Sequence, residues 1–141
     1  MTYATLDHLT DRYGTDLLVQ LTDRAPEATG VIDADVVARA LEDTDRFIDG
    51  FMGRYVLPLV EVPGLLTDLA QSIAIWKLHR FKPDEKIEAD YRDALRALRD
   101  IGSGVITLSV AGVEPQTSGG SGARITDRER PLTAENLKGF I

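Results

Sequence analysis

The sequence contains no cysteine in its 141 residues. This absence excludes a disulfide framework, a thiol nucleophile and any metal site built on thiolates. Aromatic residues make up only 6% of the chain, so the core must consist mainly of aliphatic side chains. No apolar run reaches the roughly 20 residues that a membrane-spanning helix needs, and the first residues lack the pattern of a secretory signal. We therefore expect one soluble, intracellular domain.

Basic charge is scarce in the first third of the chain. Residues 1–50 hold eleven acidic and four basic side chains, residues 51–110 hold eight of each, and residues 111–141 hold four of each. The whole net charge of −7 therefore arises in the first 50 residues. Proteins that grip nucleic acid need clustered lysine and arginine to displace counterions from phosphate. We expect no direct binding of DNA or RNA.

Residue patterns typical of catalysis or metal binding are also missing. The two histidines, His8 and His79, stand alone, without the spacing of a metal-binding pair. No glycine-rich phosphate loop and no GxSxG sequence is present. The loop 23–33 is acidic, but its sixth and twelfth positions are Ala28 and Ala34, where a calcium loop needs glycine and glutamate. The sequence thus favours a protein that is not an enzyme, with no metal and no cofactor.

Hydrophobic periodicity predicts five helices in the first 104 residues. Threonine or aspartate caps mark most of their starts, and glycines mark several of their ends. The fourth helix is apolar on nearly all sides, which is typical of the centre of a bundle. The predicted fold is therefore all-α, a small antiparallel bundle with long central helices. In chain order the helices are residues 5–13, residues 15–23 capped by Thr15, a helix from Asp33 with an apolar stripe reaching Tyr55, residues 65–81, and a helix from Pro83 and Asp84 to Gly102 and Gly104.

The last third of the chain changes character. Residues 105–110, VITLSV, predict a short strand whose partner would be another chain. Residues 112–123 have the composition of a flexible linker. The apolar end of the chain is typical of an arm that orders when it meets a groove, although a tail folded back on its own bundle is the alternative. We assign residues 1–110 to a helical domain and 111–141 to a linker and docking arm, with predicted contacts at Arg130, Leu132, Leu137, Phe140 and Ile141.

Residues 45–59, DRFIDGFMGRYVLPL, place Gly50 and Gly53 within or just after the third helix. Each glycine costs roughly 1 kcal/mol relative to alanine inside a helix. Either the helix frays at this point, or another backbone approaches this face closely. The residues themselves leave both alternatives open.

The same stretch resembles the small head–tail connector proteins of Mu-like tailed phages and prophages. Their pattern is an acidic helix ending in Ile-Asp-x-Tyr/Phe, then Arg-Tyr-x-x-Pro-Leu, then Val-Pro and an apolar helix. The resemblance extends over roughly residues 3–110 and includes YATLDHLTDRYG, QLTDR and RDALRALRDIGSGVITL. It departs at residues 23–33, where many relatives have an Asp/Gly-rich, calcium-like run. The matching residues here are Ile48, Asp49, Phe51, Arg54, Tyr55, Pro58, Leu59, Val62 and Pro63.

This resemblance implies a structural virion protein of the phage neck, made in the host cytoplasm and in contact with no membrane. Such adaptors form a ring, usually dodecameric, beneath the portal protein and offer a surface to stopper and tail-side neck proteins. DNA passes through the channel without specific binding, and we expect Asp43, Asp45 and Asp49 to face it. The alternative is a soluble helical regulatory module whose C-terminal tail binds a partner protein. A ring needs a heterologous contact, which we predict at Gly50, Gly53, Arg54, Tyr55, Leu57 and Pro58.

Overall fold

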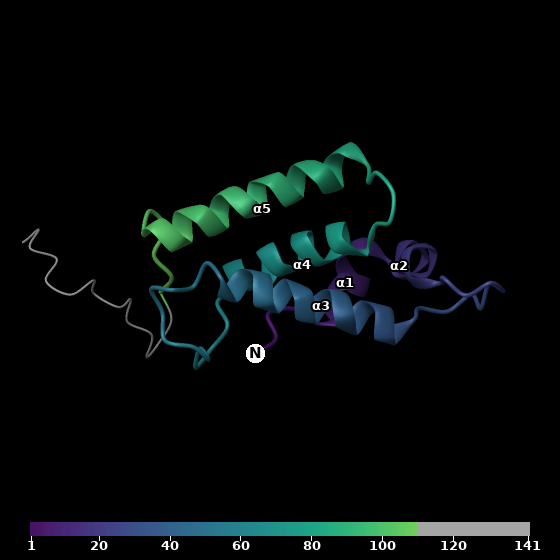
Figure 1. The fold of residues 1–141 in the computed structure, drawn as a ribbon, viewed down its shortest axis with the longest axis horizontal. Helices are drawn as coiled ribbons and strands as arrows, with labels where there is room; N and C mark the ends of the chain where they lie inside the picture. The colour runs from purple at the N-terminus through teal and green to yellow at the C-terminus, as the bar shows by residue number, and fades with distance from the viewer. Residues whose placement is uncertain (110–141) are drawn as a thin grey trace, which may run out of the picture.

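Five α-helices follow one another in the computed structural model, which describes residues 1–109 (Figure 1). This confirms the predicted all-α class and the predicted number of helices. The helices are α1 (Leu6–Tyr13), α2 (Thr15–Thr22), α3 (Ala34–Asp49), α4 (Gly64–Leu78) and α5 (Glu85–Ser103). None of the helices in this part of the chain is long and apolar enough to cross a bilayer.

Helix α4 is the centre of the bundle. It packs against α3 and α5, which run antiparallel to it, while α1 and α2 cover the side near its C-terminal half (Figure 1). This central position explains why the helix is apolar on nearly all sides. Side chains on several sides of it, such as Leu66, Ile73 and Ile75, are wholly shielded from water. Two aliphatic clusters result, one between α3, α4 and α5 and one beneath α1 and α2.

Capping residues determine where most helices begin. The side chains of Thr5, Asp33 and Asp84 accept hydrogen bonds from backbone amides in the first turns of α1, α3 and α5. The predicted cap at Thr15 is wrong by one residue. Gly14 ends α1 and directly precedes α2 with φ 87°, a left-handed conformation that lets the two helices join without further residues, so Thr15 is already helical.

The predicted strand at residues 105–110 is also wrong, because residues 105–109 form no strand. Their backbone is bonded within the subunit instead. The amide of Ile106 donates to the carbonyl oxygen of Asp100 at 3.0 Å, and the amide of Leu108 donates to the hydroxyl of Tyr55 at 2.8 Å. The Leu108 side chain is buried in the bundle. Ile106 packs against the same cluster, whereas Val105 and Thr107 are exposed.

Candidate interaction surface

The two glycines of the stretch 45–59 lie at the end of α3. Helix α3 stops at Asp49, and Gly50 forms its C-terminal cap. A β-carbon added at Gly53 would meet no atom within 4 Å, and one at Gly50 would meet only carbonyl oxygens of its own helix, the nearer at 3.3 Å. Within the subunit, therefore, no second backbone approaches these residues, and they mark the end of the helix. Their predicted contact with another subunit stays a prediction.

Arg54 binds the C-terminus of α5. Its Nε donates to the carbonyl oxygen of Gly102 at 3.0 Å, and its Nη2 donates to that of Ser103 at 2.8 Å. These carbonyls have no partner within the helix and lie at the negative end of its dipole. Gly104 follows with φ 87°, and a β-carbon there would come within 2.7 Å of the guanidinium. The arginine predicted at a subunit interface thus caps a helix of its own subunit.

Tyr55 and Phe51 complete this connection. Tyr55 is buried, and its hydroxyl accepts the Leu108 hydrogen bond. The carbonyl oxygen of Phe51 lies so near Gly102 that a β-carbon there would be only 3.2 Å away. We call this contact between the loop after α3 and the end of α5 the α3–α5 joint; it consists of Phe51, Arg54, Tyr55, Gly102 and Gly104. The joint determines where the chain leaves the bundle towards residue 110.

Large apolar side chains are exposed beside the joint. In the part of the chain that the structure describes, eight large hydrophobic residues are exposed. Val31 and Phe81 belong to the loops between α2 and α3 and between α4 and α5, whereas the other six belong to the α3–α4 loop, the start of α4, the residues after α5, and Met1, whose sulfur contacts the amide of Leu59. The loop between α3 and α4, residues 50–63, carries two charged residues, Arg54 and Glu61. This loop lies at the end of the bundle where α5 terminates (Figure 1). We call this surface the apolar end; its residues are Met1, Val56, Leu57, Val60, Leu65 and Val105.

The predicted interface residues therefore have different surroundings. Gly50, Gly53, Arg54, Leu57 and Pro58 are exposed, whereas Tyr55 belongs to the core. The sequence did not single out Val56 and Val60, although a run of aliphatic residues around a proline between two helices is a usable signal for an exposed apolar loop. The predicted arm contacts, Arg130, Leu132, Leu137, Phe140 and Ile141, lie outside the described residues.

Two carboxylates of α3 bind the first residues of the chain. The Tyr3 amide donates to Asp45 Oδ1 at 3.0 Å, and the Tyr3 hydroxyl donates to Asp49 Oδ1 at 2.5 Å. Burial and the hydrogen bond to Asp49 raise the pKa of Tyr3 above its ordinary value. Only Asp43, of the three aspartates expected to face a channel, is fully on the solvated side. Asp45 and Asp49 are partly buried because they anchor the N-terminal segment, a contact that helical periodicity does not reveal.

Asp45 has an unfavourable charge in this environment. Burial is the largest effect on this carboxyl and raises its pKa, against the opposing hydrogen bond from Tyr3. A raised pKa means that this group favours the folded state at low pH and loses that contribution as pH rises through its folded pKa.

We therefore expect Asp45→Asn to raise the melting temperature at pH 7, because the amide oxygen still accepts the Tyr3 hydrogen bond without a buried charge. The gain should vanish below the ordinary aspartate pKa of about 3.9, where the parent carboxyl is neutral too. Thermal unfolding followed by circular dichroism from pH 3 to 8 measures this. A melting temperature that is unchanged or lowered at pH 7 would contradict it.

The loop between α2 and α3 is closed by Asp23. Its carboxylate accepts hydrogen bonds from the amides of Thr29 and Gly30, at 2.8 and 3.0 Å, and from the Thr29 hydroxyl at 3.0 Å. The amide of Gly30, followed by the Thr29 groups, lowers the pKa of Asp23. In residues 1–109 no group of three or more acidic or histidine side chains gathers as a metal site would require. The acidic composition of this loop thus has a structural use.

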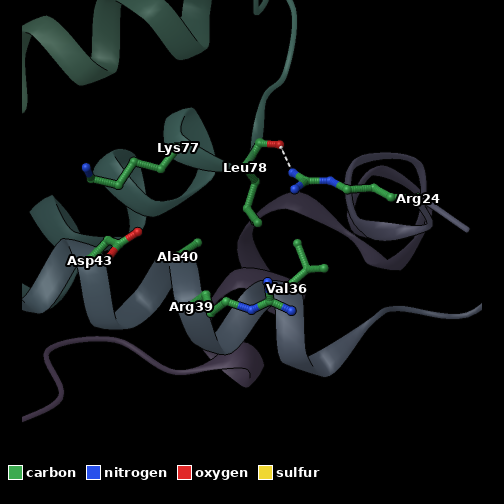
Figure 2. A pocket seen from close by; sticks show the side chains of 7 residues that line it. All are labelled: Arg24, Val36, Arg39, Ala40, Asp43, Lys77 and Leu78. Atoms are coloured by element: carbon green, nitrogen blue, oxygen red, sulfur yellow. Dashed lines mark hydrogen bonds between the residues drawn. The ribbon is translucent and has the colours of Figure 1, made fainter.

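A basic hollow of about 150 Å³ lies where α2, α3 and α4 meet (Figure 2). Arg24, Arg39 and Lys77 line it, with Asp43 at one side. Arg24 Nη2 donates to the carbonyl oxygen of Leu78 at 2.9 Å and so caps the end of α4. In a chain with net charge −7, this hollow gathers positive charge that residue counts along the chain did not reveal.

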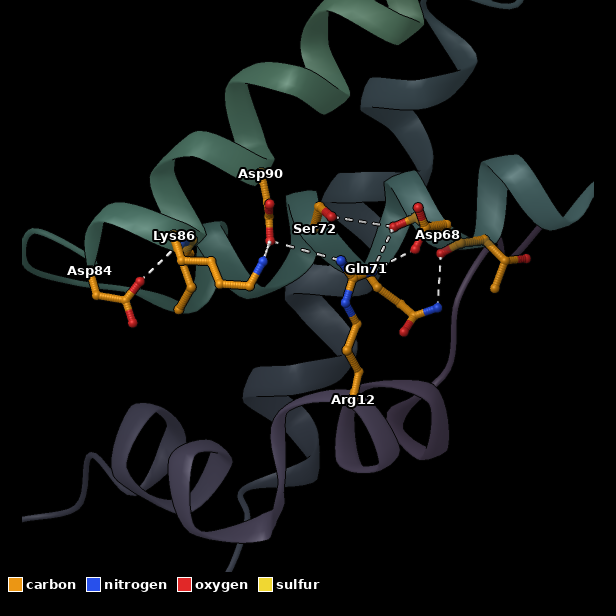
Figure 3. Close-up of polar contacts among 9 residues, drawn as sticks. Arg12, Asp68, Gln71, Ser72, Asp84, Lys86 and Asp90 are labelled. Atoms are coloured by element: carbon orange, nitrogen blue, oxygen red, sulfur yellow. Dashed lines mark hydrogen bonds and ion pairs between the residues drawn. The ribbon is translucent and has the colours of Figure 1, made fainter.

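A second hollow, of about 210 Å³, lies between the α1–α2 turn and the start of α5. We call it the α1–α5 groove; Tyr13, Leu17 and Ile87 give it an apolar lining, and Arg12, Asp84, Lys86 and Asp90 complete its lining. Arg12 pairs with Asp68 at 2.7 Å and with Asp90 at 3.9 Å, while Lys86 reaches Asp90 at 3.1 Å (Figure 3). These ion pairs tie α1, α4 and α5 together beside the groove.

The described residues thus define a small helical protein that presents two apolar surfaces, the apolar end and the α1–α5 groove. Residues 3–127 match the family described as Bacteriophage Mu, Gp36, and the chain belongs to this family. It is 37% identical over 145 aligned residues to gene product J of Escherichia phage Mu, with the whole of both chains covered. It is 33% identical over 140 residues to the Mu-like prophage FluMu protein gp36 of Haemophilus influenzae (strain ATCC 51907 / DSM 11121 / KW20 / Rd), covering 99% of this chain and 98% of the relative. The predicted relationship to Mu-like phage and prophage proteins is confirmed.

Proposed function

We propose that this protein is a head–tail connector of a Mu-like phage or prophage. In this role it forms a ring beneath the portal protein and links the DNA-filled head to the stopper and tail-side neck proteins. The observation that carries the proposal is the apolar end, since six large hydrophobic side chains exposed on one end of a small bundle are typical of a surface that another protein covers. The membership of a phage Mu family supports the same role.

The apolar end also stands where a connector needs its docking arm. The α3–α5 joint holds residues 105–109 against the bundle, so residue 109, which directly precedes the remaining C-terminal sequence, lies near the apolar end. We propose that the C-terminal arm, residues 111–141, docks on the portal through Arg130, Leu132, Leu137, Phe140 and Ile141. A body and an arm that start from one end can grip a partner at two points, which raises affinity without a larger bundle.

The charge of the bundle suits a channel through which DNA passes. Residues 1–109 hold 19 acidic and 12 basic side chains, which repel phosphate on average. Because Asp45 and Asp49 are engaged with Tyr3, exposed residues such as Asp35, Glu42 and Asp43 are the candidates for the channel wall. We propose that DNA moves past this surface without specific binding.

A pull-down with the portal protein of the same phage tests the connector role. We expect the full chain to be retained on immobilised portal, and deletion of residues 131–141 to abolish retention while the helical circular dichroism signal stays unchanged. Phe81→Ser, which alters an exposed apolar residue far from the apolar end, serves as the matched control and should bind like the parent. Absence of binding by the well-folded full chain would contradict the proposal and favour a regulatory module with another partner.

A further inference from the structure

We propose that the loop between α3 and α4 of one copy inserts into the α1–α5 groove of a second copy. The inserting residues are Val56, Leu57 and Val60, which we call the knob. This inference rests on the ring proposed above and names the two surfaces that would meet in it.

The knob has the properties of a surface that is buried in an assembly. Val56 is 64% exposed and Val60 is 82% exposed, although both lie in a loop that carries only two charges. The loop is nevertheless held in place, because Arg54 and Tyr55 bind the end of α5 and residue 108, and because Leu59 is buried between the exposed residues. A loop fixed in advance loses little conformational entropy when it binds.

The groove has complementary properties. Its volume of about 210 Å³ exceeds the roughly 150 Å³ at which an aliphatic cavity accepts a benzene ring, so aliphatic side chains can enter it. Tyr13, Leu17 and Ile87 offer these side chains apolar contacts. The lining charges of the groove balance, because Arg12 and Lys86 stand beside Asp84 and Asp90. Lys86 pairs with Asp90 at 3.1 Å, yet its side chain is 82% exposed at the edge of the groove, where it can also meet Glu61, which follows Val60 on the knob. An apolar centre with opposite charges at its edge is the usual anatomy of a protein interface.

The two surfaces lie at opposite ends of the bundle. The knob is at the end where α3 and α5 terminate, and the groove is near the start of α5 (Figure 1). A contact between two different patches of identical subunits is heterologous, and it generates a ring when the rotation closes. Pairing of two apolar ends is the competing arrangement, because it also buries the knob, but it stops at a dimer and leaves the groove empty.

Chemical cross-linking distinguishes these arrangements, since the chain has no cysteine and only introduced thiols react. We would combine Val60→Cys with Lys86→Cys and treat the protein with a short bis-maleimide, both alone in concentrated solution and in complex with the portal. The expected product is a ladder of dimers, trimers and larger species. Each single-cysteine variant should give no cross-linked product under the same conditions, because only one side of each contact then carries a thiol.

Two further substitutions in the double-cysteine protein show whether the knob carries the contact. Leu57→Asp should reduce the ladder roughly tenfold or more, because it places a charge where an aliphatic side chain is buried. Val31→Asp introduces the same charge at an exposed valine outside both surfaces and should leave the ladder unchanged.

Three outcomes would overturn the inference. They are no ladder in either setting, dimers from Val60→Cys alone with no larger species, and a ladder that Leu57→Asp does not weaken. Portal binding without a ladder would overturn this inference and leave the connector role standing. A ladder without portal binding would support the contact between copies and contradict the connector role.

Discussion

Replacement of Tyr3 with alanine is expected to lower the free energy of unfolding by about 3–5 kcal/mol, the usual loss for a buried aromatic residue. Tyr3 is 1% exposed and packs in one cluster with Ile48 and Met52. The substitution also leaves Asp49 without the hydroxyl that it accepts from. Since small domains are stable by only about 5–15 kcal/mol, a large part of the variant's stability is lost. Urea unfolding followed by circular dichroism measures the change.

Tyr3→Phe is the matched control, because it keeps the ring and removes only the hydroxyl. We expect a smaller loss of about 1.5–3 kcal/mol, the range for a hydrogen bond to a charged group. If the free energy of unfolding of Tyr3→Ala were within about 1 kcal/mol of the parent value, the loss would be far below that for a buried aromatic residue. The N-terminal segment would then not be part of the core.

The helices could be predicted from the sequence because their signals are local. The cap at Asp33 and the apolar repeat that follows it lie within a few turns, and α3 begins where both indicate. The near-uniform apolar surface of residues 65–78 likewise predicted a central helix. The prediction extends this helix to Phe81, three residues beyond its end at Leu78, because the extended conformation of His79 has no local sequence signal.

The contacts that shape the candidate surface could not be predicted in this way. Tyr3 binds α3 across 42 and 46 positions, and Arg54 binds α5 across 48 and 49. Periodicity describes one helix at a time and reveals neither contact. The predictions that Asp45 faces a channel and that Arg54 lies at a subunit interface come from the ring that the resemblance implies. The resemblance to connector proteins identified the stretch as important without showing that part of its role is to bind α5 in the same subunit.

The second large effect is expected at Gly102. This glycine lies in α5, where a β-carbon would be 3.2 Å from the carbonyl oxygen of Phe51. Valine adds two further carbons, and the neighbour is backbone, which cannot rotate away. We expect Gly102→Val to lower the free energy of unfolding by about 1–3 kcal/mol, as overpacking does, even though valine favours a helix more than glycine by a few tenths. Thermal or urea unfolding measures it.

Gly53→Val provides the comparison that decides which glycine is required for close approach. No atom lies within 4 Å of a β-carbon at Gly53. The free energy of unfolding of this variant should therefore be within about 0.5 kcal/mol of the parent value, as for most surface substitutions. Equal losses in both variants would contradict the account of the α3–α5 joint. A Gly53→Val subunit that is stable but does not assemble into a ring would instead assign Gly53 to the contact between copies. The two glycines would then serve different levels of structure, Gly102 the subunit and Gly53 the assembly.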